Sequence, residues 1–202
     1  MSSKRQDRSV QDDGPLPDDP FVLLGHWAPA DDDPDRPLAT LATVDVDGLP
    51  DARTVLLTGV SPDSVAFHTD ARSRKVGQLR AHPRAALVVR WDEQARQVVL
   101  RGAVSEISAE ASRTAYARQS RYLQLLAWLN TPELAGLARS ERERRWADFD
   151  ATRPVLDPPP NWTGYALRPV DVLFWEGSEE GPSHRVRYRR LAHGWTREAL
   201  PG

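Results

Sequence analysis

Apolar and polar positions alternate with the period of β-strands over much of this chain. Between residues 39 and 107, apolar, β-branched segments are separated by short polar turns, at residues 39–46, 52–60, 64–69, 85–91 and 97–107. Asp47-Gly48 joins the first two segments and favours a tight hairpin. The same pattern returns near the end of the chain, at residues 162–167, 170–175, 185–191 and 195–198. Short strands with tight turns are typical of a meander or barrel.

Helices are predicted in the gaps of this pattern. Residues 21–27 form a short apolar piece, and Ser73 is a candidate N-cap for a helix over residues 74–81. Pro83 ends that helix because proline cannot continue it.

A longer helical excursion separates the two groups of strands. Residues 109–129 predict one helix, and Thr131-Pro132 suits the start of another. Ser140 and Glu143 have the spacing of a capping box for a further helix. The order of meander, helices and closing strands predicts an α+β fold, mainly β, built around one barrel.

Composition narrows the class of protein. The length of 202 residues suits one domain, expected over residues 21–202 after a disordered, charged arm at residues 1–20. The net charge of −2 does not favour nucleic acid or an anionic membrane as a partner, and the lack of cysteine excludes disulfides and a cysteine nucleophile. No apolar run is long enough to span a bilayer, so a cytoplasmic location is expected.

Cationic and hydroxyl side chains gather where two strands and a helix are predicted. Arg53 lies in a strand, and Ser73, Arg74 and Lys75 open the following helix, which is a natural seat for a phosphate. The amide of Gln97, at the start of a later strand, can both donate and accept hydrogen bonds. Taken singly, these residues also fit a solvated strand, an ordinary helix start and an edge-strand amide.

In order along the chain, the segments LATVDVDGLPDARTVLLTGV, FHTDARSRKVGQLRAHPRAALVVRW and RQVVLRGAVSEIS resemble the pyridoxamine 5'-phosphate oxidase family. The tail FWEGSEEGPSHRVRYRR…GWTREALPG is similar to that family's C-terminal segment. The resemblance extends from about Leu38 to the end and is weakest in the helical middle. It implies a Greek-key split β-barrel that binds flavin mononucleotide (FMN) at the interface of a homodimer.

The resemblance also implies roles for single residues. Arg53, Arg74 and Lys75 would bind the flavin phosphate, with help from Thr69 and Ser73. The other implied FMN contacts are Thr54, Val55, Leu56, Thr58, His68, Gln97, Trp175 and Arg185.

Arg185 and His184 are the candidate catalytic residues. Arg185 would stabilise negative charge over the reacting face of the flavin, to which the substrate gives a hydride before oxygen reoxidises it. His184 would orient or protonate a substrate, or is a surface histidine beside Arg187 and Arg189. The histidines have no metal-ligand spacing, so no metal is predicted.

The chain departs from the family where a substrate phosphate would bind. Thr58 stands where the family has a lysine that contacts flavin and substrate phosphate. The family's tyrosine, arginine and serine align with Ala115, Gln119 and Leu123, and one-residue shifts in this segment would substitute Tyr116, Arg118 or Ser120. The family's Gln-Ser pair falls near Pro132 and Glu133, and its Arg-x-His falls at Gly181, Pro182 and Ser183.

These departures change the expected substrate. Each lost charge-assisted hydrogen bond removes roughly 1.5–3 kcal/mol of binding free energy, so a phosphorylated substrate should bind poorly. The sequence therefore predicts an FMN-dependent oxidase acting on the CH–NH or CH–NH2 group of a small heteroaromatic or amine from secondary metabolism, on the model of the dihydrophenazine oxidases. A true pyridoxine/pyridoxamine 5'-phosphate oxidase, a flavin- or haem-binding module without turnover, and an F420-dependent reductase stay open as alternatives.

Overall fold

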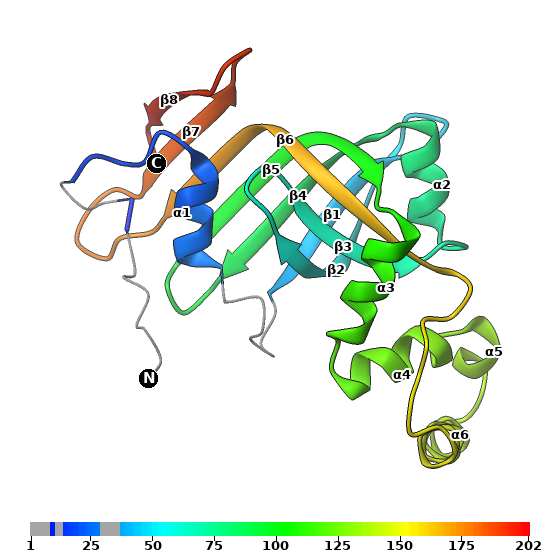
Figure 1. The fold of residues 1–202 in the computed structure, drawn as a ribbon. Helices are drawn as coiled ribbons and strands as arrows, with labels where there is room; N and C mark the ends of the chain where they lie inside the picture. The colour runs from blue at the N-terminus through cyan, green and yellow to red at the C-terminus, as the bar shows by residue number, and fades with distance from the viewer. Residues whose placement is uncertain (1–8, 11–13, 29–36) are drawn as a thin grey trace.

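The computed structural model describes residues 9–10, 14–28 and 37–202 of the chain. Strands, a helical excursion and closing strands follow in the predicted order (Figure 1). The strands are β1 (Leu38–Val44), β2 (Pro50–Val60), β3 (Val65–Asp70), β4 (Arg84–Trp91), β5 (Arg96–Glu106), β6 (Trp162–Glu176), β7 (His184–Arg190) and β8 (Trp195–Leu200). The helices are α1 (Pro20–Trp27), α2 (Arg74–Ala81), α3 (Ala109–Ala117), α4 (Arg121–Leu129), α5 (Pro132–Ala135) and α6 (Arg139–Thr152).

The strands β1 to β6 close into a barrel. The sheet runs in the order β3-β2-β1-β4-β5-β6-β7-β8, and an additional pairing of β3 with β6 closes it. Closure depends on β6, whose first half pairs with β3 and whose second half pairs with β7, while β5 pairs with both halves. The β7–β8 hairpin therefore extends beyond the barrel at one end of β6 (Figure 1).

A bulge lets β6 continue as one strand. The register between β5 and β6 shifts where Gly102 faces Pro169, a residue without a backbone N–H. A Cβ atom on Gly102 would lie 2.0 Å from the backbone oxygen of Arg168, so glycine is required there. The sequence pattern predicts two separate strands, at residues 162–167 and 170–175, and the structure corrects this to a single strand of 15 residues.

Alternate residues of the strands fill the barrel. On β3, Val65 and Phe67 are buried inside, whereas Ala66 and His68 face outward. The buried interior also includes Leu41, Leu57, Leu87, Val89, Leu100, Leu167 and Phe174. Helices α1 and α2 lie at opposite ends of the barrel, and α3 packs on β6 (Figure 1).

The predicted helix over residues 109–129 is two helices in the structure. It breaks after Ala117, and α4 begins at Arg121. The hydroxyl oxygen of Ser120 accepts a hydrogen bond from the backbone N–H of Leu123, which caps a new helix instead of continuing the old one.

Two predicted side-chain caps are also wrong. Ser140 lies inside α6, whose N-cap is Ala138, and the Glu143 carboxylate pairs with Arg139 instead of forming the capping box. Ser73 occupies the N-cap position of α2, but its side chain makes no cap hydrogen bond.

The predicted arm at residues 1–20 is described only at residues 9–10 and 14–20. The hydroxyl of Ser9 and the backbone N–H of Val10 donate to the Glu176 carboxylate at 2.7 and 2.8 Å. The Tyr188 hydroxyl donates to the backbone oxygen of Pro17 at 2.9 Å. The described part of the arm thus lies against β6 and β7.

Candidate functional site

The β1–β2 hairpin decides which candidate side chains face the barrel interior. Gly48 has a φ of +84° in its turn, and the resulting register places Arg53 on the inner face of β2 with Val55. The outer face of this strand carries Thr54, Leu56 and Thr58. The candidates on β2 therefore point in two directions.

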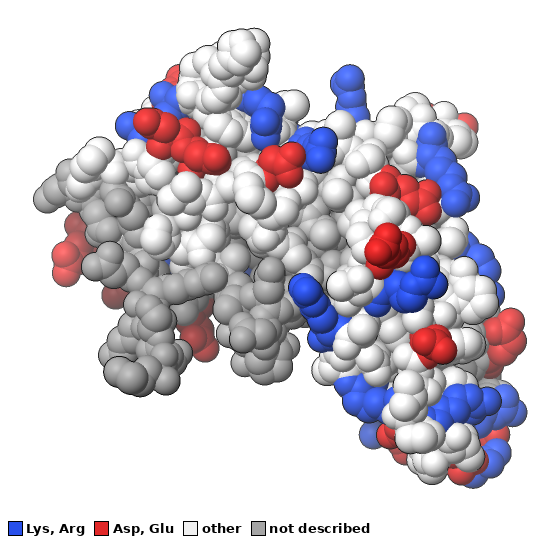
Figure 2. Space-filling view, in the orientation of Figure 1, with Lys and Arg blue, Asp and Glu red and all other residues white. Residues whose placement is uncertain are grey.

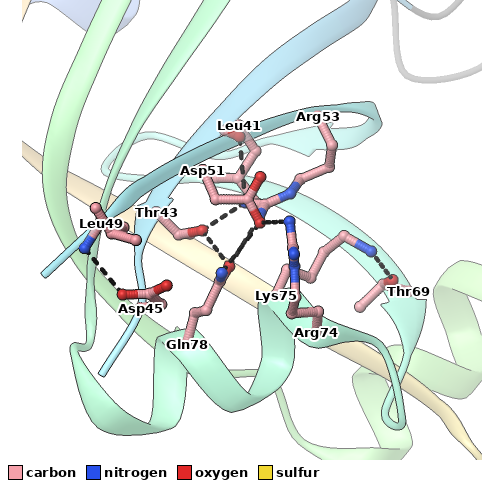
Figure 3. A network of polar contacts seen from close by, with 10 residues as sticks. All are labelled: Leu41, Thr43, Asp45, Leu49, Asp51, Arg53, Thr69, Arg74, Lys75 and Gln78. Carbon is pink, nitrogen blue, oxygen red and sulfur yellow. Dashed lines mark hydrogen bonds and ion pairs between the residues drawn. The ribbon is translucent and has the colours of Figure 1, made fainter. Parts of the chain in front are cut away.

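Arg53 is held by a dense set of acceptors at the end of the barrel covered by α2 (Figure 3). Its Nη1 donates to the hydroxyl of Thr43 at 2.5 Å and to the backbone oxygen of Leu41 at 3.3 Å. Its Nη2 donates to Asp51 at 2.6 Å and to the side-chain oxygen of Gln78 at 2.7 Å. Four hydrogen bonds thus fix this guanidinium.

Asp51 also binds the second guanidinium of the cluster. Its Oδ2 accepts from Arg74 at 2.5 Å and from the side-chain nitrogen of Gln78 at 3.0 Å. The hydrogen bond from Gln78, followed by those of Arg74 and the nearby positive charges, lowers the pKa of Asp51 to about 2. The carboxylate therefore stays ionised near neutral pH. The Arg74 side chain is 79% exposed.

Lys75 is the half-buried cation of the site. Its Nζ donates to the Thr69 hydroxyl at 3.0 Å, and that hydroxyl lies 3.4 Å from the Ser73 hydroxyl. Burial, and then the charge of Arg53, lower the pKa of Lys75. A cation that is partly desolvated beside another cation gains most from an arriving anion.

Lys75 lines a cavity of about 530 Å³ between β2, β3, α2 and α4, here called the Lys75 cavity. It gathers most of the residues expected to contact FMN: Thr54, Val55, Leu56, Thr58, His68, Thr69, Ser73 and Lys75. Leu123, Leu126 and Trp162 contribute an apolar wall opposite. The Pro132-Glu133 pair also lines this cavity.

His68 is partly buried and neutral beside Thr58. The Thr58 hydroxyl lies 2.8 Å from His68 Nδ1, and the imidazole stacks on the Trp162 ring with centroids 5.1 Å apart. Burial lowers the pKa of His68 to about 4. No described residue gives Nε2 a hydrogen bond, and a Cβ on Gly164 would lie 2.5 Å from it.

A second cavity, of about 670 Å³, adjoins α3. Arg118 is the one lysine or arginine among the described residues that line it, so it is called the Arg118 cavity. Ala115 lines it, while Thr58, His68 and Gln119 line both cavities.

The structure places the alternative candidates of the helical middle in different surroundings. The Tyr116 side chain is buried and its hydroxyl donates to the backbone oxygen of Gln124, and Ser120 caps α4, so neither lines a cavity. Of the shifted candidates, Arg118 alone faces the Arg118 cavity.

The remaining candidates form a row across β5, β6 and β7. Gln97 pairs with Trp175, and Trp175 pairs with Arg185. Directly paired residues share a face of the sheet, and the neighbouring Val98 is buried inside, so this row faces outward. His184 comes one position earlier and belongs to the opposite face of β7.

This row lies far from the Lys75 cavity within one chain. His68 pairs with Gly164 near the start of β6, and Trp175 lies near its end. At about 3.3 Å per residue, the strand separates these positions by about 35 Å. One small cofactor can contact both groups only if a second copy of the chain supplies the row.

Other ligand classes find less support, since positive and negative side chains are interspersed over the face shown in Figure 2. No group of three or more histidine, aspartate or glutamate side chains suited to a metal ion occurs in the described ranges. Likewise, no described helix combines the length and apolar character of a membrane span.

Sequence reasoning missed Asp51 and Gln78, which organise the cation cluster. A local signal existed for each, because Asp51 is two residues from Arg53 on the same strand face, and Gln78 is four residues from Arg74 on the same helix face. Trp162, for which the sequence predicted no role in the site, forms a cavity wall against His68.

Two family models match the sequence. Residues 34–153 match the model described as pyridoxamine 5'-phosphate oxidase, and residues 162–201 match the pyridoxine 5'-phosphate oxidase C-terminal dimerisation region. The second match includes Trp175 and Arg185, so the row on β6 and β7 falls in a region associated with dimerisation.

Relatives and solved structures agree with these matches. Two proteins named pyridoxine/pyridoxamine 5'-phosphate oxidase are similar to the chain. The one from Caulobacter vibrioides is 33% identical over 202 residues, covering 96% of this chain and 91% of its own. The one from Rubrobacter xylanophilus is 39% identical over 163 residues, covering 79% and 75%.

Among solved structures, a pyridoxamine 5'-phosphate oxidase-related, FMN-binding protein from Nostoc punctiforme is 26% identical with a TM-score of 0.66, over 82% of this chain and 87% of that one. PhzG from Burkholderia lata, in complex with tetrahydrophenazine-1-carboxylic acid, shares the fold with a TM-score of 0.75 at 24% identity, over 92% and 94%.

Proposed function

Because this chain belongs to the pyridoxamine 5'-phosphate oxidase family, we propose that it is a homodimeric, FMN-dependent oxidase whose substrate is not pyridoxine 5'-phosphate. The substrate would be a small heteroaromatic or amine, such as a secondary-metabolite intermediate, oxidised at a CH–NH or CH–NH2 group.

The Lys75 cavity suits FMN in size and chemistry. Its volume of about 530 Å³ lies in the range of small-ligand sites. Lys75, Thr69 and Ser73 offer a cation and hydroxyl donors to the phosphate, and Leu56 on the outer face of β2 offers apolar contact to the ring. When bound, FMN would supply the hydride acceptor and pass the electrons to oxygen.

A second copy of the chain would complete this site. Its Gln97, Trp175 and Arg185 row would cover the cavity, since these residues lie too far away in the same chain. Arg185 would hold a positive charge near the reacting groups, whereas His184 lies on the opposite face of β7 and does not share this row.

The neutral Thr58–His68 pair is the observation that carries the substrate proposal. Thr58 stands where the resemblance expects a lysine, and its partner His68 is uncharged near neutral pH. Ala115 and Gln119 add no charge to the same surface. The pair itself therefore offers a phosphate dianion no cation in exchange for its water.

A true pyridoxine/pyridoxamine 5'-phosphate oxidase is the second candidate. The names of the relatives favour it, and Arg118 offers one cation in the neighbouring cavity. Under this alternative Arg118 would bind the substrate phosphate.

The purified protein separates these proposals. Its absorption spectrum and the mass of any released cofactor would test for FMN. Titration with pyridoxine 5'-phosphate and with reduced heteroaromatics, while peroxide is measured, would then test the substrate. Rapid turnover of pyridoxine 5'-phosphate would favour the second candidate, and loss of that turnover in Arg118→Ala would assign the residue.

A further inference from the structure

One carboxylate oxygen organises the cation cluster beside the Lys75 cavity. Asp51 Oδ2 accepts hydrogen bonds from Arg53 on β2 and from Arg74 and Gln78 on α2 (Figure 3). The same atom thus joins a strand to the first turns of a helix, and both guanidinium groups take their positions from it.

The bonds to Arg53 leave it little freedom. Both Nη nitrogens are occupied, by Thr43 and Leu41 on one side and by Asp51 and Gln78 on the other. These bonds use all four Nη hydrogens, so Arg53 would offer an arriving anion its Nε–H and its charge, and its fixed position lowers the entropic cost of binding. Arg74 differs, because its side chain is 79% exposed and Asp51 is its described partner.

The net charge of the cluster also favours a phosphate as its ligand. Arg53, Arg74 and Lys75 with Asp51 leave a net charge of about +2, which matches a phosphate monoester of about −1.5 to −2. Without Asp51, three cations would repel one another across a small space, and the exposed Arg74 would be the first to swing into solvent.

We propose that Asp51 is a positioning residue for the flavin phosphate, which holds the guanidinium groups of Arg53 and Arg74 ready beside Lys75. This inference rests on the proposed FMN-dependent function. Asp51, Arg53 and Arg74 line neither the Lys75 cavity nor the Arg118 cavity, so the cluster would meet the phosphate at the edge of the Lys75 cavity, beside Lys75.

The test compares FMN with riboflavin, which has the same ring and no phosphate. Dissociation constants for both would be measured by flavin fluorescence quenching on apoprotein of the wild type, Asp51→Ala, Asp51→Asn and Asp51→Glu. We expect Asp51→Ala to weaken FMN by about tenfold, which corresponds to one charge-assisted hydrogen bond, and to leave riboflavin unchanged. The FMN affinity of Asp51→Asn should lie between those of the wild type and Asp51→Ala, and Asp51→Glu should recover part of the wild-type affinity.

Asp45→Asn is the matched control. Asp45 carries the same charge near the cluster, but its carboxylate bonds only the backbone N–H groups of Asp47 and Leu49 in the hairpin, which asparagine can also do (Figure 3). We expect no change in the ratio of FMN to riboflavin affinity. Inorganic phosphate as a competitor of FMN provides a second measure, and its inhibition should weaken in Asp51→Ala.

An unchanged FMN-to-riboflavin ratio in Asp51→Ala would overturn the inference, and tighter FMN binding would show that Asp51 competes with the phosphate instead. Equal loss of both ligands, with altered thermal unfolding, would assign Asp51 a purely structural role and also overturn it. Failure of the wild type to bind FMN would contradict the proposed function itself, which distinguishes the two failures.

Discussion

The hydroxyl oxygen of Thr58 lies 2.8 Å from Nδ1 of His68, and this pair is common to the Lys75 and Arg118 cavities. Both side chains are uncharged near neutral pH, since burial lowers the pKa of His68 to about 4. A ligand that extends from one cavity to the other would therefore pass a neutral hydrogen-bonding pair. The pair would favour an uncharged substrate group at this point.

Replacing Thr58 by lysine should change the preference for charge. In Thr58→Lys we expect pyridoxine 5'-phosphate to bind about tenfold more tightly, because one charge-assisted hydrogen bond becomes available. Thr58→Met, of similar length and no charge, is the control and should show no gain. The dissociation constant would be measured from the perturbation of bound-flavin absorption. Equal affinities in the two variants would refute the role given to this position.

His68 should make stability depend on pH. Between its usual pKa of 6.5 and its folded pKa of about 4, the unfolded chain binds a proton at His68 that the folded chain does not. The free energy of unfolding should therefore fall as pH decreases through this window. From about pH 7 to about pH 5, wild type should lose about 2 kcal/mol more than His68→Gln in urea denaturation. Parallel losses would contradict the buried, neutral imidazole.

Gly164 should be intolerant of a side chain. A Cβ there would lie 2.5 Å from His68 Nε2 and 3.0 Å from the Ser112 hydroxyl, so the imidazole would have to leave the Trp162 ring. We expect Gly164→Ala to cost about 1–3 kcal/mol in urea denaturation, as overpacking does, and to change the near-ultraviolet dichroism of tryptophan. Gly59→Ala, where a Cβ meets nothing within 4 Å, is the control and should be nearly neutral.

Mixed dimers can test the divided site. Lys75→Ala in α2 and Arg185→Ala in β7 should each weaken FMN binding by about tenfold or more. Because a dimer of one variant with the other contains one intact site, refolding the two together should restore flavin binding that neither has alone. Mixing Lys75→Ala with Thr69→Ala, both from the same cavity, should restore none. Absence of recovery in the first mixture would argue against a shared site.

The sequence predicted well those parts of the fold that depend on neighbours along the chain. The hairpin at Gly48 and the strands β1 to β5 follow from local alternation and turn chemistry. β6 was predicted as two strands because Pro169 interrupts the local pattern, and the bulge that accommodates it depends on Gly102 of another strand. Because Gly102 and Pro169 are far apart in the sequence, no pattern of neighbouring residues indicates this bulge.

In the candidate site, too, sequence predicted what depends on neighbouring residues and missed what depends on contacts between distant elements. The motif positions on β2, β3 and α2 could be identified from spacing alone, and eight of them line one cavity. Sequence could not show that Tyr116 and Ser120 serve the fold, since that depends on where α3 ends. Nor could it show that Arg53 and Arg74 share Asp51, because that contact brings a strand and a helix together.

The unbroken course of β6 has a consequence for redesign. One strand carries Gly164 near one end and Trp175 near the other. The number of residues between them therefore sets the distance between the two parts of the proposed shared site. Because side chains alternate, a single inserted residue between these points would turn Trp175 from the outer surface to the interior. Lengthening the protein is therefore best attempted in the β7–β8 turn near Gly194, where added residues leave the spacing between Gly164 and Trp175 unchanged.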